Sequence, residues 1–165
     1  MSDGLTIRTL RADDHARLVK MDLALSGMIR GAWYEGQLRR ALDESDLRIS
    51  LGCEIDGLLV GAMLASVQYG EFGEPEPTAI LDTVLVDPDF SRRGVASALL
   101  EQLLENLAGL RIGQVRTELS WDELDLLAFF GKAGFQPVPR LVLELEVNPG
   151  LERARERSEA QDETF

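Results

Sequence analysis

The sequence has very little cysteine and histidine, and this scarcity limits the chemistry open to the protein. Its 165 residues include one cysteine, Cys53, and one histidine, His15. A single cysteine cannot form an internal disulfide, which fits a reducing compartment, and its place among alternating apolar residues indicates core packing rather than catalysis. One histidine supplies neither a catalytic triad nor a metal cluster, so we expect no metal site.

Positive charge and long apolar runs are also scarce. The chain has 17 Lys and Arg residues against 29 Asp and Glu, and its formal net charge is −12. A nucleic-acid partner is therefore disfavoured, because phosphate binding needs clustered cations, whereas a basic substrate is compatible with this charge. No apolar run is long enough to span a bilayer, and no secretory signal pattern is visible at the start. We expect a soluble cytoplasmic protein that does not bind membranes.

The remaining composition is that of a globular protein, with 45% hydrophobic and 28% charged residues. This length predicts one domain with a substantial core, which we place at residues 1–149. Residues 150–165 are almost all charged or small and polar. Such a segment buries too little apolar surface to offset the entropy of ordering, so we expect a frayed helix or a disordered tail.

Hydrophobic periodicity predicts a mixed α/β fold. Strands are expected at 5–10, 47–55, 58–67, 80–86, 115–119, 135–138 and 141–147, and helices at 15–25, up to residue 42, at 96–107 and at 124–133. Asp56-Gly57 between two strand patterns is a hairpin signal, since glycine accepts positive φ. Antiparallel hairpins with one β-α-β crossover predict a mixed, mostly antiparallel sheet of six to seven strands, with helices on both faces.

The stretch 80–104 is the most informative part of the chain. A dense run of branched apolar residues ends at Val86, and Pro88 then breaks the strand because it fixes φ and removes a backbone donor. Arg92, Arg93 and Gly94 follow and lead directly into an amphipathic helix. Unpaired N–H groups at a helix start carry partial positive charge, so this turn predicts an anion-binding cradle.

Two segments resemble the signatures of one family. Val86-Asp87-Pro88, followed by S-R-R-G-V-A at 91–96, resembles the acyl-CoA motif of the GNAT superfamily of N-acetyltransferases, although Ser91 stands where Gln or Arg is usual. The segment 127–135, L-A-F-F-G-K-A-G-F, resembles the second signature of that family, with Phe130 in place of the usual Tyr and Gly131 in place of Glu. The predicted element order is also that of the GNAT fold.

This resemblance implies transfer of an acetyl group from acetyl-CoA, as cosubstrate, to a primary amine by direct attack in a ternary complex. In the family a bulge in the fourth strand splays it from the fifth, and the pantetheine pairs with the exposed strand backbone, here Val84, Leu85 and Val86. An N–H near Leu85 would stabilise the oxyanion. The remaining cofactor-binding residues that the resemblance implies are Arg92, Arg93, Gly94, Val95, Ala96 and Ser97 for the pyrophosphate, and Phe130 and Lys132.

Asp82 is the candidate general base, because it is the only acid within the expected fourth strand, 80–86, and an unpaired acid in an apolar strand is costly. The alternative is an Asp satisfied by Arg or backbone partners, and Glu118 and Glu35 are weaker candidates. Phe130 has no proton to give to the leaving thiolate. Ser120, Tyr34 or water could supply it, or no acid is needed.

Met28, Trp33 and Tyr34 are candidates for the acceptor site, although Trp33 and Tyr34 could equally pack the second helix. One rival interpretation is a catalytically weak acyl-CoA-binding or regulatory module on the same fold, favoured by Ser91 and Phe130. A second is an unrelated α/β binding domain whose basic turn holds some other anion. The sequence does not name the acceptor amine, and GNAT-like domains often form homodimers.

Overall fold

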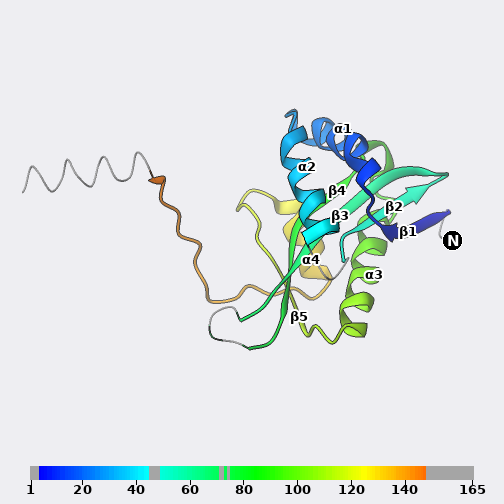
Figure 1. Ribbon diagram of the computed structural model, residues 1–165. Helices are drawn as coiled ribbons and strands as arrows, with labels where there is room; N and C mark the ends of the chain where they lie inside the picture. Colours follow the sequence, from blue (N-terminus) through cyan, green and yellow to red (C-terminus); the bar gives the residue numbers. More distant parts are fainter. Residues whose placement is uncertain (1–3, 45–48, 71–72, 74, 148–165) are drawn as a thin grey trace, which may run out of the picture. The chain divides into compact units, whose positions relative to one another are not determined.

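The computed structural model describes residues 4–44, 49–70, 73 and 75–147 (Figure 1). The chain divides into two compact units, residues 1–120 and residues 121–165. The elements of the first unit are β1 Leu5–Thr9, η1 Ala12–Asp14, α1 His15–Ser26, α2 Gly31–Arg39, the short π-helix η2 Arg40–Glu44, β2 Leu51–Ile55, β3 Leu58–Gln68, β4 Thr78–Val86, η4 Pro88–Phe90, α3 Val95–Gly109 and β5 Gln114–Thr117. The second unit contains α4 Leu124–Lys132.

The first unit is built on a five-stranded sheet in the order β1-β2-β3-β4-β5. The first three ladders are antiparallel, and only β4 and β5 run parallel, joined through α3. The β2–β3 hairpin turns at Asp56 and Gly57, whose φ angles of 51° and 78° are both positive, as expected for this dipeptide. The predicted mixed sheet with one crossover is confirmed.

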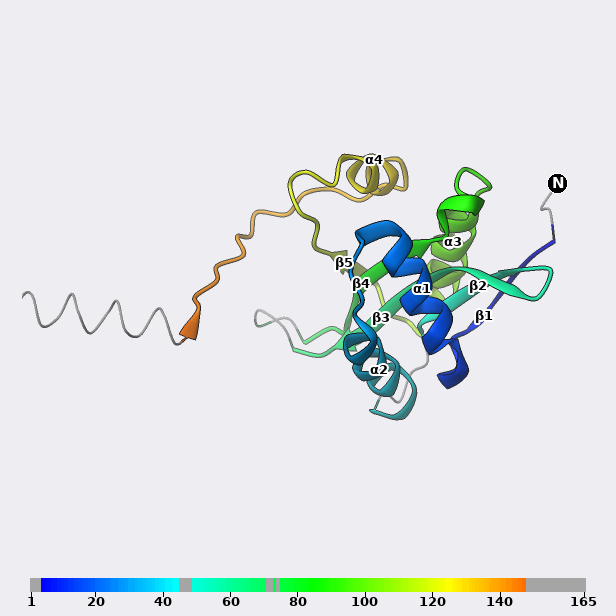
Figure 2. The same ribbon diagram turned by 90° about the horizontal axis from the view of Figure 1, so that it is seen from above.

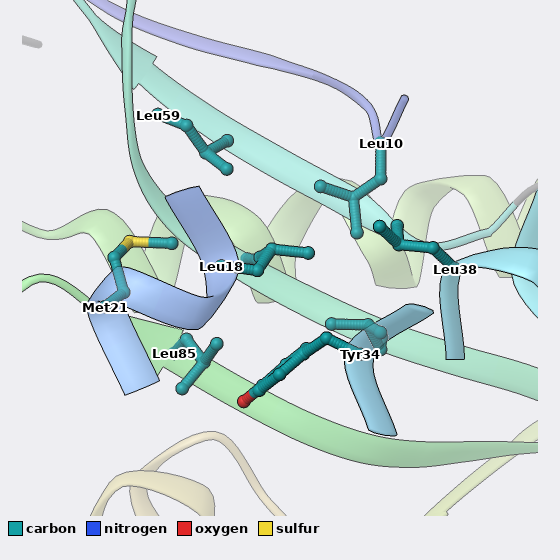
Figure 3. Packing of buried hydrophobic residues seen from close by; sticks show 9 residues of the cluster. Leu10, Leu18, Met21, Tyr34, Leu38, Leu59 and Leu85 are labelled. Atoms are coloured by element: carbon teal, nitrogen blue, oxygen red, sulfur yellow. The ribbon is translucent and has the colours of Figure 1, made fainter. Parts of the chain in front are cut away.

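Helices cover both faces of this sheet, as the sequence predicts (Figure 1 and Figure 2). Helices α1 and α2 pack on one face, where Figure 3 shows nine buried side chains pointing toward one another. That cluster consists of Leu10, Leu18, Met21, Tyr34, Leu38, Leu59, Ala62, Leu64 and Leu85. Helix α3 packs on the opposite face through the buried Leu99 and Leu103, both on its predicted apolar stripe.

Gly61 of β3 sets how closely α3 approaches the sheet. A Cβ at this position would overlap Val95 Cγ1 and would lie 3.2 Å from both the Leu85 carbonyl oxygen and Leu99 Cδ1. The start of α3 therefore rests directly on the backbone of β3.

We expect Gly61→Ala to destabilise the protein by about 1–3 kcal/mol, because the added methyl group overpacks this contact. Gly36→Ala is the matched control: no atom lies within 4 Å of its added Cβ, and Ala favours the helix interior by up to about 1 kcal/mol. Chemical denaturation of both variants should give shifts of opposite sign, and a stable Gly61→Ala would contradict the close packing.

The second unit corrects one part of the predicted sheet. Residues 135–147 form no strand in the structure, although 135–138 and 141–147 were expected to supply two. The alternating side chains Leu141, Leu143, Leu145 and Val147 are 67–88% exposed. Alternation favours an extended backbone, but a strand exists only where another strand accepts its hydrogen bonds. The described sheet thus has five strands rather than six or seven, within the predicted fold class.

The predicted tail at 150–165 lies outside the described residues, and the domain boundary at residue 149 stays a prediction. None of the described helices is long and apolar enough to cross a membrane.

Candidate active site

Strand β4 contains one extra residue near its middle. In the ladder with β3, Leu64 pairs with Thr83 and Ala65 pairs with Leu81, so Asp82 has no residue opposite it. This is a β-bulge, which bends a strand and increases its local twist. Asp82, the candidate base, therefore occupies the point at which β4 changes direction.

Beyond this bulge, β4 extends past the end of its parallel neighbour. The β4–β5 ladder ends at the pair Leu81 and Thr117, where the Thr117 hydroxyl donates to the Leu81 carbonyl oxygen at 2.9 Å. The next residues of β4, Asp82–Val86, have no β5 partner among the residues described. The bulge and the free edge that the family resemblance implied are both present.

The β3 ladder determines which backbone groups of β4 face that edge. The Asp87 N–H donates to the Val60 carbonyl oxygen at 2.8 Å, so the preceding pair, which includes Val86, is a non-hydrogen-bonded one. Because backbone direction alternates along an antiparallel ladder, the N–H and C=O groups of Val84 and Val86 point away from β3. Those of Leu85 point toward β3 and belong to its ladder.

The turn after β4 is held by Asp87. Its carboxylate accepts from the Asp89 N–H at 2.9 Å and forms a short ion pair with Arg17 of α1, which also donates to the Leu59 carbonyl oxygen at 2.7 Å. Burial alone would raise the pKa of Asp87, but the Asp89 amide and the Arg17 guanidinium outweigh it and lower this pKa. The turn is thereby tied to both α1 and β3.

Gly94 connects this turn to α3. It is the N-cap of the helix and has a φ of 76°, in the left-handed region that favours glycine, and Arg92 has a φ of 63°. No atom would lie within 4 Å of a Cβ at Gly94. The space beside Gly94, at the start of α3, is therefore unfilled. Arg92 and Arg93 are exposed in the same turn, with the Arg93 guanidinium 5.1 Å from the centre of the Phe90 ring.

A cavity of about 310 Å³ lies beside the bulge, on the face of the sheet that α2 covers. Its lining residues come from α2, η2, the start of β2, β3 and β4: Gln37, Arg40, Ala41, Ser50, Leu64, Ala65, Ser66, Gln68 and Asp82. Asp82 is open to solvent within this cavity, yet its surroundings remove part of its hydration. Desolvation raises the pKa of Asp82, the positive charge of Arg40 opposes the rise, and the negative charge of Glu118 adds to it.

The three predicted acceptor residues lie on or beside α2 in different environments. Met28 is 53% exposed and Trp33 is 40% exposed, whereas Tyr34 is fully buried in the cluster of Figure 3. Burial, followed by the charge of Asp22, raises the pKa of Tyr34 to about 12. None of the three lines the cavity beside Asp82. Tyr34 packs in the core, as one of its two interpretations expected. The substrate-binding roles of Met28 and Trp33 stay predictions.

The remaining predicted residues stand apart from this arrangement. Ser120 is exposed at the end of the first unit. Phe130 is buried within the second unit, with ring centroids 5.1 Å from Phe129 and 4.8 Å from Phe135, and Lys132 is exposed in the last turn of α4. Their roles in catalysis and cofactor binding stay predictions.

The sequence patterns missed the polar lining of the cavity. Gln37 and Arg40 are one helical turn apart, and this spacing was the only local signal that they share a face. Ser50 stands next to an apolar strand and is buried, with its hydroxyl donating to the Ala65 carbonyl oxygen at 3.1 Å and accepting from the Ala65 N–H at 3.0 Å. The Ser50 hydroxyl thus satisfies both backbone groups of Ala65, the β3 residue that lies opposite the bulge.

Residues 19–135 match the model of the acetyltransferase (GNAT) family. The chain belongs to this family. The match includes the β4 bulge, the Gly94 turn and α4, so the resemblance carried by the two short signatures is confirmed. A comparison with curated protein sequences gave no match.

Solved structures of GNAT proteins share the fold. The aminoglycoside N-acetyltransferase AAC(6')-Iy in complex with CoA is 18% identical, with a TM-score of 0.71 over 86% of this chain and 94% of that one. A ribosomal-protein-alanine N-acetyltransferase from Brucella melitensis biovar Abortus 2308 is 18% identical, with a TM-score of 0.69 over 86% of this chain and 99% of that one. Ard1 from Thermoplasma volcanium is 23% identical, with a TM-score of 0.67 over 81% of this chain and 83% of that one. At these identities the likeness concerns the fold.

Proposed function

We propose that this GNAT protein transfers an acetyl group from acetyl-CoA to a primary amine by direct attack in a ternary complex. Three features that follow one another along the chain support this proposal. Asp82 stands at the bulge, Val84 and Val86 direct backbone groups toward an edge that has no β5 partner among the described residues, and Gly94 caps the start of α3 with unfilled space beside it. Their order matches the order of reactive end, amide arm and phosphates in an acyl-CoA.

The residues present fit an acyl-CoA molecule, which supplies an activated acyl group when bound. The N–H groups at the start of α3 suit a pyrophosphate, and two exposed arginines add positive charge. These cofactor-binding residues are Arg92, Arg93, Gly94, Val95, Ala96 and Ser97. The free β4 edge suits the amides of the pantetheine arm, in the manner of strand addition. We assign this pairing to Val84 and Val86, and we leave Leu85 to its ladder with β3.

The chemical work left to the protein is small: deprotonate the amine, stabilise the oxyanion and return a proton to the thiolate. We assign the first task to Asp82, whose raised pKa narrows the gap to the pKa of an amine. The second falls to an N–H on the free β4 edge, at Val84 or Val86. For the third we propose Ser120 or water. A cytoplasmic location and a homodimer also stay proposals.

Two measurements test this function in turn. Calorimetric titration with acetyl-CoA tests for the cofactor site and should show one site per chain. An assay for CoA thiol release over a panel of amines then tests for transfer. Binding without release on any amine would favour the alternative, a catalytically weak acyl-CoA-binding module, for which the absence of a phenol at Phe130 is the supporting observation.

The Gly94 turn offers a test of the cofactor site in which backbone strain is matched. Asp and Asn both tolerate positive φ and have the same shape, so Gly94→Asp and Gly94→Asn differ in charge. We expect Asp to weaken acetyl-CoA binding by roughly tenfold or more relative to Asn, because its carboxylate would face the phosphates. Calorimetry on both folded variants measures this difference. Equal affinities would show that the phosphates bind elsewhere.

A further inference from the structure

Among the described residues that line the cavity beside Asp82, two carry a charge, the cation Arg40 and the anion Asp82. The other described lining residues have amide, hydroxyl or aliphatic side chains. The cavity volume of about 310 Å³ is at the lower end of the range for small-molecule sites, and it suits a compact polar molecule.

Arg40 differs from three arginines elsewhere in the first unit. Arg8, Arg17 and Arg30 each form an ion pair with a carboxylate. Arg40 is exposed at the first position of η2, and within the described part of the chain no carboxylate lies within salt-bridge distance of it. Its charge nevertheless acts on Asp82 across the cavity. A guanidinium placed in this way has its donors available for a ligand, and its planar fork matches a carboxylate.

We propose that the acceptor is a small amino carboxylate, whose amine faces Asp82 and whose carboxylate is held by Arg40. This inference rests on the proposed acetyltransferase function and names the acceptor class for the same site. The two charges of such a molecule are complementary to the two charges of the cavity. A polycationic acceptor fits this cavity less well, because the guanidinium of Arg40 would repel it.

The reaction with this acceptor is balanced. The ammonium group loses one proton to solvent to become a free amine, and its nitrogen forms a bond to the thioester carbonyl carbon. The carbon–sulfur bond breaks, and its electron pair stays on sulfur. The second proton leaves nitrogen for the Asp82 carboxylate, and the thiolate takes up one proton. The products are an N-acetylated amino carboxylate and CoA thiol. The carboxylate of the acceptor takes no part in bond making, so Arg40 acts on specificity.

The test compares acceptors that differ only in the carboxylate. Glycine, β-alanine and 4-aminobutyrate are each paired with their terminal amides, and kcat/KM is measured from thiol release. We expect at least one of these pairs to show a preference for the carboxylate of roughly tenfold to a hundredfold, the usual range for a charge-assisted hydrogen bond. Arg40→Gln should bring the ratio of kcat/KM for carboxylate over amide close to one, because it should lower kcat/KM for the amino carboxylate and leave that for its amide unchanged.

Arg39→Gln is the matched control, because Arg39 is also exposed but does not line the cavity. It should keep the wild-type ratio. If Arg40 served only to hold Asp82 ionised, Arg40→Gln would change both members of a pair alike, and the unchanged ratio would overturn the proposal. A wild-type protein that prefers the amides would also overturn it. Thiol release with simple amines would in that case still support the acetyltransferase function. Failure of the acceptor proposal can therefore be distinguished from failure of the proposed function.

Discussion

Asp82→Asn is expected to lower turnover by roughly a hundredfold or more at neutral pH while leaving acetyl-CoA affinity nearly unchanged. A positioned general base contributes on this order, and the Asn amide has the same shape without the ability to take up a proton. Asp82 lines the cavity beside the bulge and does not belong to the Gly94 turn, so cofactor binding should not depend on it. Steady-state kinetics and calorimetry on the same preparation measure the two quantities separately.

The control for this variant is Glu118→Gln. The charge of Glu118 raises the pKa of Asp82, so its removal should lower that pKa and move the acidic limb of the pH–rate profile toward lower pH. Turnover at neutral pH should change little. If Glu118→Gln abolished turnover and Asp82→Asn did not, the base would be Glu118.

Stability supplies an independent readout for Asp82. Its pKa is raised on folding, so its favourable contribution to stability is full below the unfolded pKa of about 3.9 and is lost as the pH rises through the folded-state value. Asp82→Asn should therefore be at least as stable as wild type at pH 7, and its relative advantage should disappear near pH 3. Thermal unfolding at both pH values measures this. A variant that is less stable at pH 7 would show that Asp82 is satisfied by partners in the fold, as the alternative interpretation holds.

The features that could be predicted from the sequence are those that a few neighbouring residues determine. Pro88 ends β4 because it cannot extend a strand, and the basic turn through Gly94 leads into α3. Asp56-Gly57 forms its hairpin because glycine accepts positive φ. Each of these signals acts within two or three residues, and the structure reproduces each one.

The features that were missed depend on contacts between distant segments. The cavity beside the bulge is lined by residues as far apart in the sequence as Gln37 and Asp82, and no local pattern predicts that they meet. The family resemblance implied a bulge in the fourth strand, but its position at Asp82 was not predicted, because a bulge is defined only relative to the register of β3. Residues 141–147 show the converse, since their alternation is clear but no partner strand pairs with them in the structure.

Arg8→Met is expected to lower the free energy of unfolding by about 2–3 kcal/mol, because it removes the cation from a partly buried ion pair and leaves a carboxylate behind. Arg8 donates two hydrogen bonds of 2.8 Å to Asp14 and one of 2.6 Å to Glu54. It thereby joins β1 to the start of α1 and to β2. The Asp14 side chain is 6% exposed, so after the substitution its charge would remain buried without this cation.

The matched control is Arg11→Met, three residues further along the chain. Arg11 is 58% exposed, and its ion pairs with Asp13 and Glu54 are 3.4 Å and 3.5 Å long. Exposed pairs of this kind contribute little, so we expect a loss of less than about 1 kcal/mol. Urea denaturation of the two variants compares the same change of side chain at a partly buried and at an exposed position.

The pH dependence of the Arg8→Met effect distinguishes charge from packing. Burial alone would raise the pKa of Asp14, but the hydrogen bonds from Arg8 and from the Arg11 backbone outweigh it and lower this pKa. The stability that Asp14 contributes is therefore present above its unfolded pKa of about 3.9 and is lost as the pH falls through the folded-state value. The deficit of Arg8→Met should be large at pH 7 and should shrink below about pH 4. An equal deficit at pH 7 and pH 3 would mean that the apolar stem of Arg8, and not its charge, stabilises this junction.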